Sequence, residues 1–262
     1  MNAHKKKTPL ILRLLSFAVL LLLSGCAYFA ASPPSPPLAR QEIDRIVSAF
    51  EEQERAVDTL FSSTALTVDV QGFQSEAMVL IVARRNPSTI KIEITHPWGR
   101  PLLHVLVKGP YLDILSFSEK RHYRGRLASS EISKLIPVPV SPDILWTLSR
   151  AYPVLPHYHR AQSTKGDQIS LMDKQNADIQ VVDLYPDTYL PRRVWFCQQE
   201  TYMSFSAFQS SNGILYAKEI SLSSNDSTAR MTLKIRQMTF NSPLPEAIFK
   251  QETPRGFERV QM

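Results

Sequence analysis

Apolar and polar side chains alternate with a period of two along most of this 262-residue sequence, and no other feature restricts its fold as strongly. In residues 89–95, for example, Ile90, Ile92 and Ile94 alternate with polar side chains. Because successive side chains of a strand point to opposite faces of a sheet, this alternation predicts half-buried strands. Eleven or twelve strands are predicted, at residues 64–71, 75–84, 89–95, 102–108, 111–118, 121–125, 168–173, 178–184, 192–198, 201–209, 214–223 and 230–240.

The connections between these segments are short and rich in turn residues, as at Gly72, Asn86-Pro87 and Gly109-Pro110. Short connections between successive strands favour an antiparallel meander. An open twisted sheet of more than about ten strands tends to curl. The sequence therefore predicts an α+β fold, with a strongly bent antiparallel sheet (an incomplete β-barrel of about eleven strands) that wraps around its helices.

Three segments have helical periodicity instead. Residues 38–61 carry apolar side chains at helical spacing and charged side chains between them, which predicts an amphipathic helix of about 20 residues. Two short apolar helices are predicted in the middle of the chain, at 129–136 and 141–148. The second has Ser141 as its N-cap and Pro142 at its first helical position.

The N-terminus has the layout of a secretory signal. A basic segment, residues 1–9, precedes an apolar run at residues 10–23, which is shorter than the roughly 20 residues that span a bilayer. The run ends in Leu23-Ser24-Gly25-Cys26, which resembles the lipobox of bacterial lipoproteins. That resemblance implies cleavage before Cys26 and attachment of diacylglycerol and fatty acyl (palmitate) groups there. The alternative is an ordinary secretory signal with an incidental cysteine.

A proline-rich stretch at residues 32–37 follows, and we expect it to form an extended spacer. The sequence thus divides into a signal peptide at 1–25, a lipidated cysteine and tether at 26–37, and a folded domain at 38–262. Two or three acyl chains hold a protein on a membrane far more firmly than one. Ala27 stands where aspartate commonly retains lipoproteins at the inner membrane, so sorting rules of double-membraned bacteria imply delivery to the outer membrane.

Composition and charge exclude several classes of protein. With 44% apolar residues, 21% charged residues and 2 Cys, the chain is neither disordered nor stapled by disulfides. The net charge of +6 suggests nucleic-acid binding at first sight. However, the first 25 residues contain four of the 30 basic residues and no acidic residue, so the other positions carry 26 basic and 24 acidic residues. We therefore expect no nucleic-acid partner.

Candidate chemical sites are weak. The sequence has no G-x-S-x-G, H-E-x-x-H or C-x-x-C motif and no glycine-rich phosphate loop. His157 and His159 have a spacing that two ligands of one metal could use, but without a third ligand we interpret them as exposed turn residues. Asp183 and Asp187 flank a turn, where capping explains them. Cys197 is interpreted as a buried inert thiol and not a reactive one. We expect no catalytic residues, no metal and no cofactor.

Four local motifs, together with the order of the elements, carry a resemblance to a known family. They are His96-Pro97-Trp98-Gly99-Arg100-Pro101-Leu102, Tyr123-Arg124-Gly125, Tyr189-Leu190-Pro191-Arg192-Arg193-Val194 and Pro245-Glu246-Ala247-Ile248-Phe249. Over residues 38–257 the chain resembles the LolA-like superfamily and, within it, the outer-membrane lipoprotein receptors of the LolB type. Trp98 departs from the receptor pattern, which has another exposed apolar residue at that turn.

The resemblance implies that the helices form a lid over an apolar cavity on the concave face of the sheet, where acyl chains bind. The residues expected to line it are Leu80, Ile92, Ile94, Leu145, Trp146, Leu148, Phe205 and Leu233. For each of them alone, ordinary core packing is the alternative. Trp98 is the expected membrane-contacting residue, and the alternative is an indole that folds back onto the sheet.

The function implied is that of a non-enzymatic, chaperone-like lipoprotein on the outer membrane, with its domain facing the periplasm. It would be a monomer that receives the acyl chains of lipoproteins from a soluble periplasmic LolA-like carrier and helps insert them into the membrane. A second reading is a lipid-binding or envelope-stress-sensing lipoprotein of the same fold with a different hydrophobic ligand. A third is a hydrolase whose site the sequence does not reveal.

Overall fold

The computed structural model describes residues 36–127, 141–225 and 229–262. Pro36–Met262 form one compact unit. This unit holds the described hydrophobic core, so we expect it to fold without the preceding residues. The helices described in it are α2 (Arg40–Arg55), α3 (Pro142–Arg150) and the short 3₁₀ helices η3 (Cys197–Gln199) and η4 (Glu246–Phe249). None of the helices in the described ranges is long and apolar enough to cross a bilayer.

A single sheet contains the 14 strands of the described residues. The strands are β1 (Thr59–Val70), β2 (Phe73–Arg84), β3 (Thr89–Thr95), β4 (Pro101–Lys108), β5 (Tyr111–Ser116), β6 (Arg121–Arg126), β7 (Arg160–Gln162), β8 (Gln168–Met172), β9 (Asp178–Leu184), β10 (Pro191–Phe196), β11 (Thr201–Ser211), β12 (Ile214–Ser224), β13 (Ala229–Phe240) and β14 (Glu258–Gln261).

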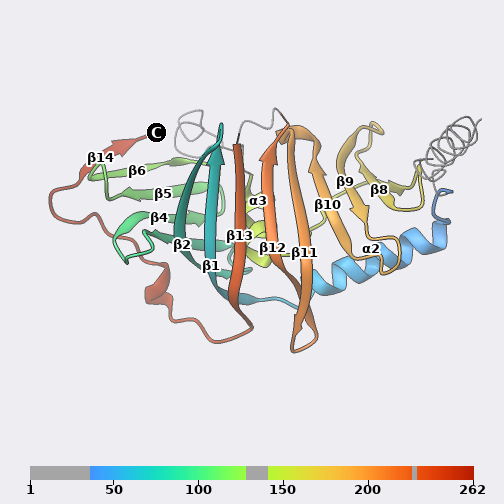
Figure 1. Cartoon of the computed structure of the whole chain (residues 1–262), viewed down its shortest axis with the longest axis horizontal. Coiled ribbons are helices and arrows are strands. Elements are labelled where there is room, and N and C mark those ends of the chain that lie inside the picture. The colour runs from blue at the N-terminus through green and yellow to red at the C-terminus, as the bar shows by residue number, and fades with distance from the viewer. Residues whose placement is uncertain (1–35, 128–140, 226–228) are drawn as a thin grey trace, which may run out of the picture. The chain divides into compact units, whose positions relative to one another are not determined.

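The sheet consists of two antiparallel meanders that meet in its centre (Figure 1). Strands β1 to β6 run outward in one direction, and β13 back to β7 run outward in the other. The two meanders are joined by the antiparallel pairing of β1 with β13, from Leu60 opposite Phe240 to Val70 opposite Ala229. The chain then returns to the far edge, where β14 pairs with β6 in parallel.

The predicted bent antiparallel sheet is observed, but the strand count was too low. The two unpredicted strands, β7 and β14, have only 3 and 4 residues. Segments this short show too few alternations to be recognised from periodicity. Both lie at the edges of the sheet, where pairing with the neighbouring strand defines them.

The predicted helix at 38–61 was too long, because α2 ends at Arg55 and β1 begins at Thr59. The apolar residues at the end of the predicted helix also suit a strand, since Leu60 and Leu66 are buried at positions of the same parity. All 12 residues of β1 pair with β2 on one side, and Leu60–Val70 pair with β13 on the other, so this segment forms a strand. Helical spacing in a short window cannot reveal these partners.

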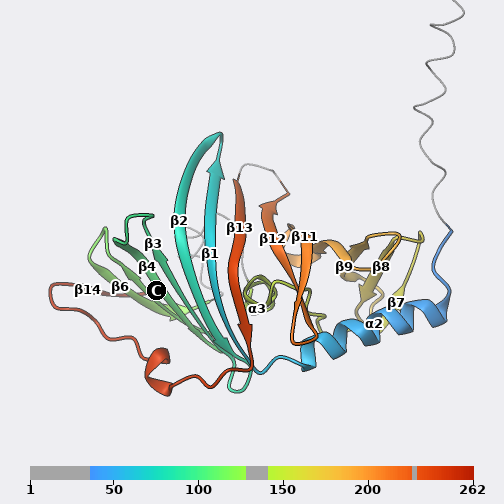
Figure 2. The ribbon, with the colours of Figure 1, turned by 60° about the horizontal axis from the view of Figure 1, so that its bottom comes forward.

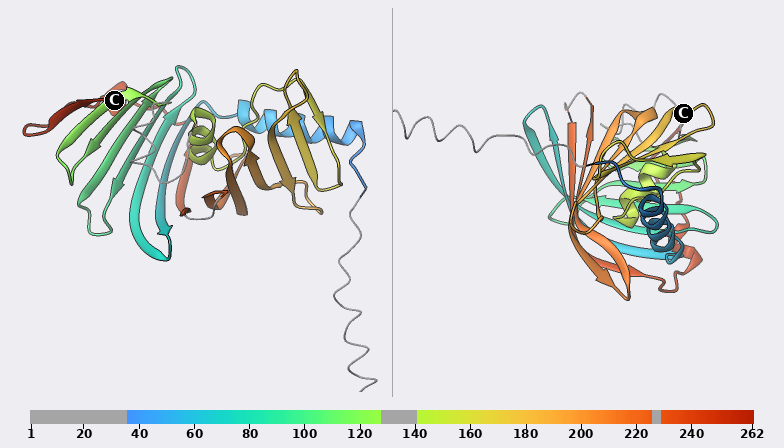
Figure 3. Two further views of the ribbon diagram at one scale, coloured as in Figure 1. Left: turned by 90° about the horizontal axis from the view of Figure 1, so that it is seen from above. Right: turned by 90° about the vertical axis from the view of Figure 1, so that its right-hand side faces the viewer.

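Both described α-helices lie on one side of the sheet, on its inner face (Figures 2 and 3). Ile43, Ile46, Val47 and Phe50 of α2 are buried, and Arg40 of α2 donates from Nη1 to the carbonyl oxygen of Ala161 in β7 at 3.0 Å. Helix α2 therefore covers the half of the sheet that contains β7. Helix α3 contacts β1, β2 and β3 near the centre.

Helix α3 begins as the sequence predicts. The Ser141 hydroxyl oxygen accepts from the backbone N–H of Ile144 at 3.2 Å, and Pro142 is at the start of the helix. The other helix predicted in this region, at 129–136, lies outside the described residues.

The C-terminal segment, residues 241–262, crosses the outer face of the sheet. Phe249 of η4 is buried there, with the Arg84 guanidinium 4.8 Å from its ring centroid. Gln251 donates from Nε2 to the carbonyl oxygen of Asp113 at 3.2 Å.

Candidate functional site

An apolar pocket of about 300 Å³ lies on the inner face, between α3 and the central strands. Strands β1 to β5, β12 and β13 supply most of its wall, and α3 supplies Leu145 and Leu148. The full lining is Leu66, Val68, Ser75, Glu76, Ala77, Val79, Ile81, Ile92, Ile94, Leu102, Leu103, Val105, Leu112, Ile114, Leu127, Leu145, Leu148, Leu222, Met231 and Leu233.

The chemistry of this pocket is uniform. Among the described lining residues only Ser75 and Glu76 are polar, and both are exposed residues near the tip of the β1–β2 hairpin. A ligand inside the pocket would therefore meet aliphatic side chains and few directional polar groups. Its volume is at the lower end of the roughly 300–1,000 Å³ typical of small-molecule sites, which suits a slender chain better than a bulky polar molecule.

Five of the eight residues predicted for the cavity line this pocket. Ile92 and Ile94 lie on β3, Leu145 and Leu148 on α3, and Leu233 on β13. Sequence patterning brings them together because each belongs to the buried parity of its strand or to one face of the helix.

The other three predicted residues lie elsewhere. Leu80 is 39% exposed on the outer face, because its neighbours Val79 and Ile81 occupy the inner parity of β2. Trp146 is turned away from the pocket, with the Arg85 guanidinium 5.9 Å from its ring centroid. Phe205 is buried in β11, a strand that does not contribute to the pocket lining.

Sequence reasoning missed most of the wall from β1, β2, β4 and β5. Residues 77–83 are almost continuously apolar, so alternation cannot show which parity of β2 faces inward. The pairing of Ile81 with Ile92 and of Val79 with Ile94 aligns the inner residues of β2 and β3. This register, and not the period, identifies Val79 and Ile81 as pocket residues.

A buried arginine holds the helix that forms one wall of the pocket. Arg150, at the end of α3, is fully buried and donates from Nη1 to the carbonyl oxygen of Leu215 at 2.6 Å and from Nη2 to that of Gln53 at 3.1 Å. Its guanidinium lies 4.8 Å from the centroid of the Phe240 ring. Burial lowers the pKa of Arg150 to about 10, so it remains charged at neutral pH. Arg150 therefore ties α3 to α2 and to β12.

Trp98 is at the tip of the β3–β4 turn and is 89% exposed. The N–H of Gly99 donates to the carbonyl oxygen of His96 at 2.7 Å, and Gly99 has φ of 85°, a conformation that favours glycine. The indole stacks on His96, with ring centroids 4.3 Å apart, and does not fold back onto the sheet. The turn therefore presents an aromatic ring to the surroundings.

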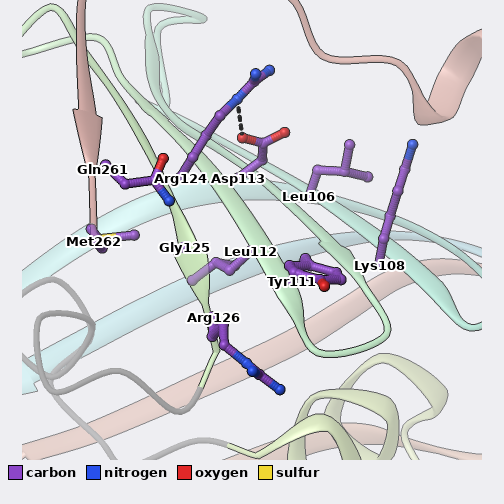
Figure 4. Close-up of a pocket in the computed structure, with 10 residues that line it drawn as sticks. All are labelled: Leu106, Lys108, Tyr111, Leu112, Asp113, Arg124, Gly125, Arg126, Gln261 and Met262. Atoms are coloured by element: carbon purple, nitrogen blue, oxygen red, sulfur yellow. Dashed lines mark hydrogen bonds and ion pairs between the residues drawn. The ribbon is translucent and has the colours of Figure 1, made fainter.

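A second pocket, of about 590 Å³, lies at the end of the sheet formed by β4, β5, β6 and β14 (Figure 4). Lys108, Arg124, Arg126 and Tyr111 line it, and Arg124 donates from Nε to Asp113 at 2.7 Å. Close packing against the chain end forms part of this wall, because a Cβ on Gly125 would lie 2.7 Å from the carbonyl oxygen of Met262. It is an open surface hollow whose lining mixes charged and apolar side chains, unlike the apolar pocket.

Next to this hollow, a buried histidine connects the sheet to the C-terminal segment. His122 is completely buried, with Nδ1 2.7 Å from Oγ1 of Thr253 and Nε2 3.0 Å from Oδ1 of Asp113. Burial lowers the pKa of His122, which favours the neutral ring. A hydroxyl, an imidazole and a carboxylate in line are also the parts of a hydrolytic triad. Here, however, the His122 ring has no exposed atom for a substrate to reach. We therefore interpret the contacts of His122 with Thr253 and Asp113 as structural contacts that hold the C-terminal segment against the sheet.

The remaining candidates provide no further site. Within the described residues, no group of three His, Cys, Asp or Glu side chains is placed to hold a metal. Cys197 is half-buried and not fully buried as predicted, and burial raises the pKa of its thiol. Asp183 is buried and accepts from Nη2 of Arg193 at 2.7 Å, which explains it without acid–base chemistry. Cys26 lies outside the described residues.

Comparisons with known proteins were informative at the level of structure alone. No protein-family model matches the sequence, and no curated protein matches it. A DUF1329 family protein from Desulfovibrio piger is similar in structure, with a TM-score of 0.56 at 12% identity, over 79% of this chain and 97% of that one.

Two further solved structures are similar to the same degree. A LolA superfamily protein from Nitrosomonas europaea has a TM-score of 0.54 at 14% identity, over 80% of this chain and 97% of that one. A domain assigned to outer-membrane lipoprotein sorting, from Vibrio parahaemolyticus, has a TM-score of 0.54 at 11% identity, over 80% of this chain and 96% of that one. At these identities the likeness concerns the fold, and the chain therefore has the LolA-like fold.

Proposed function

We propose that this protein is a lipid-anchored envelope lipoprotein that binds the acyl chains of other lipoproteins and helps insert them into the outer membrane. The observation that carries the proposal is the apolar pocket on the inner face, with aliphatic side chains from seven strands and α3. Moving one methylene group from water into an apolar site is favourable by about 0.8 kcal/mol. A lining of aliphatic side chains can therefore bind an acyl chain without directional contacts.

The fold and the N-terminus support this assignment. The structural neighbours include a LolA superfamily protein and a domain assigned to outer-membrane lipoprotein sorting. The lipobox-like Leu23-Ser24-Gly25-Cys26 supports a lipid anchor on the chain itself, and Ala27 supports the outer membrane as its location. An anchored binder is suited to receive cargo at one membrane, whereas a free carrier moves between membranes.

The proposed mechanism is binding and release without bond chemistry. The acyl chain enters between β1–β5 and α3, from a soluble LolA-like carrier in the periplasm. Leu145 and Leu148 of α3 and Ile92 and Ile94 of β3 contact it on opposite sides. Trp98, which protrudes from the β3–β4 turn, contacts the bilayer at delivery.

Replacement of Leu145 by Glu tests the pocket. An unpaired carboxylate on the pocket wall carries a desolvation penalty of several kcal/mol, so binding of a fluorescent fatty acid to Pro36–Met262 should fall by at least about 100-fold. Circular dichroism shows whether the variant is folded. The measurement is a fluorescence titration of the folded protein.

Leu80→Glu is the matched control. It introduces the same charge on the outer face of β2, where Leu80 is already 39% exposed, and should leave fatty-acid affinity within about twofold. If a folded Leu145→Glu variant bound as tightly as the wild type, or if both variants lost binding equally, the pocket would not be the acyl-chain site.

A further inference from the structure

Two aromatic residues are far more exposed than the other large apolar side chains of the described residues. They are Trp98, at 89%, and Phe73, at 83%. Phe73 is the first residue of β2, at the tip of the β1–β2 hairpin. Each ring leaves most of its apolar surface in water, and contact with an apolar or interfacial partner would bury that surface.

Both rings lie at turns on the same end of the strands. In an antiparallel meander the connections alternate between the two ends of the strands. The β1–β2 and β3–β4 turns therefore lie at one end, and the β4–β5 turn lies at the other. Tyr111, at the β4–β5 turn, is the third exposed aromatic side chain among the described residues, at 63%, and it lies at the opposite end of the strands.

The β1–β2 hairpin projects past its neighbour β3. The pairing of β2 with β3 ends at Met78 opposite Thr95, so Phe73–Ala77 extend beyond it, by about 16 Å for a strand rise of roughly 3.3 Å per residue. Asp69 braces the tip, because it accepts from the N–H of Gly72 at 3.0 Å and from Nε2 of Gln74 at 3.1 Å. Phe73 is thus held out on a defined hairpin.

The apolar pocket extends to the same end of the strands, between these two hairpins. Its lining includes Ser75 and Glu76, two and three residues from Phe73, and Ile94 and Leu102, each four residues from Trp98. A surface that engages both tips would therefore lie against the end of the pocket.

We propose that Phe73 and Trp98 form a two-point contact with the interfacial layer of a zwitterionic phospholipid bilayer, and that this contact places the end of the pocket against the lipid. The inference rests on the proposed function, which it extends by a second contact residue and an orientation. Two rings on separate hairpin tips fit a fluid surface better than a shaped protein partner. Charges near the tips are mixed, with Asp69 and Glu76 beside Phe73 and His96 and Arg100 beside Trp98, so apolar insertion and not net charge drives the contact.

Vesicles of phosphatidylcholine and phosphatidylethanolamine test the contact, with the unlipidated unit Pro36–Met262 and no acyl ligand. Phe73→Ser and Trp98→Ser should each lower the partition coefficient about tenfold, and the double variant about 100-fold. Tyr111→Ser is the matched control and should change it less than twofold. Binding should be equally strong at low and high salt.

A direct readout uses tryptophan as a depth probe. In a Trp98→Phe background, whose remaining emission from Trp146 and Trp195 is subtracted, Phe73→Trp should add emission that shifts to the blue and is quenched by brominated lipids, whereas emission added by Tyr111→Trp should show neither effect. The inference is overturned if Phe73→Ser binds vesicles like the wild type, if Tyr111→Ser loses as much as Phe73→Ser, or if the tryptophan at position 73 is not quenched.

These outcomes are independent of the pocket. If Leu145→Glu retained fatty-acid binding, the proposed function would fail while Phe73 and Trp98 still bound vesicles. If Phe73 had no effect on vesicles while Leu145→Glu abolished fatty-acid binding, the two-point contact alone would fail.

Discussion

At the scale of single residues, three tryptophans of one chain have three different environments. Trp146 is buried in α3, and Trp195 stacks on Tyr202 at 4.1 Å between ring centroids. Trp98 is almost fully exposed, because a turn closed by Gly99 holds it beyond the ends of β3 and β4. The tight turn, and not the side chain itself, determines what this indole can contact.

Trp98→Glu should separate binding from delivery. The substitution removes an exposed ring and adds a carboxylate that the bilayer interface disfavours, so transfer of an acylated protein into liposomes should slow by at least about tenfold. Fatty-acid affinity and the circular dichroism spectrum should stay as in the wild type, since no pocket residue changes. Tyr111→Glu is the control, because it introduces the same charge at the opposite end of the strands. A parallel loss of binding and delivery would instead place Trp98 in the binding site.

At the scale of elements, the C-terminal segment is held by contacts that involve two histidines, and burial lowers the pKa of both. His122 is buried among Asp113, Arg124 and Arg259, and desolvation lowers its pKa below the usual 6.5. His104 contacts Phe117, which in turn contacts Phe257 of this segment, and desolvation lowers its pKa as well, with Glu93 and Lys91 as charged neighbours. In the unfolded chain both rings take up a proton at a higher pH than in the folded protein.

Acidification should therefore release the C-terminal segment. The stability that the neutral rings provide is present above pH 6.5 and is lost as pH falls below it, because the unfolded state then binds more protons. Amide exchange of Glu258 and Met262, corrected for intrinsic rates, should be faster at about pH 5.5 than at about pH 7.5. His122→Gln should reduce the difference. Equal protection at both pH values would show that His122 does not control this segment.

At the scale of the whole molecule, the pairing of β1 with β13 unites two meanders into one continuous sheet. Helix α2 covers the half of the sheet that contains β7, and the apolar pocket lies between α3 and strands β1–β5, β12 and β13. The fold thus provides a core on one side and a lined hollow on the other. In the proposed function, the location of this molecule in the cell depends on Cys26, which precedes the folded unit.

Cys26→Ala should abolish lipid anchoring of the intact protein. Without the thiol no diacylglycerol can be attached, so the variant should remain unprocessed or appear as a soluble periplasmic form. Fractionation of cells that produce the variant and the wild type measures this, and Cys197→Ala is the control for loss of a thiol. Wild-type protein found in the soluble fraction would contradict the proposed anchor.

The sequence by itself determined the local structure of most of the chain. Period-two alternation indicated 12 of the described strands, and Ser141 with Pro142 located the start of α3, because side-chain parity and cap chemistry are properties of neighbouring residues. The same parity placed Ile92, Ile94 and Leu233 on the apolar faces of their strands, and the resemblance to the LolA-like superfamily implied that these faces line a cavity.

The tertiary structure decided everything that depends on distant partners. It assigned residues 59–63 to β1 and not to the helix, and it placed Leu80 outside and Val79 inside, because strand register fixes parity where both parities are apolar. It added the short edge strands β7 and β14, and it placed Phe73 at the same end of the strands as Trp98. These outcomes depend on pairings between residues that lie far apart in the chain, which a local pattern does not contain.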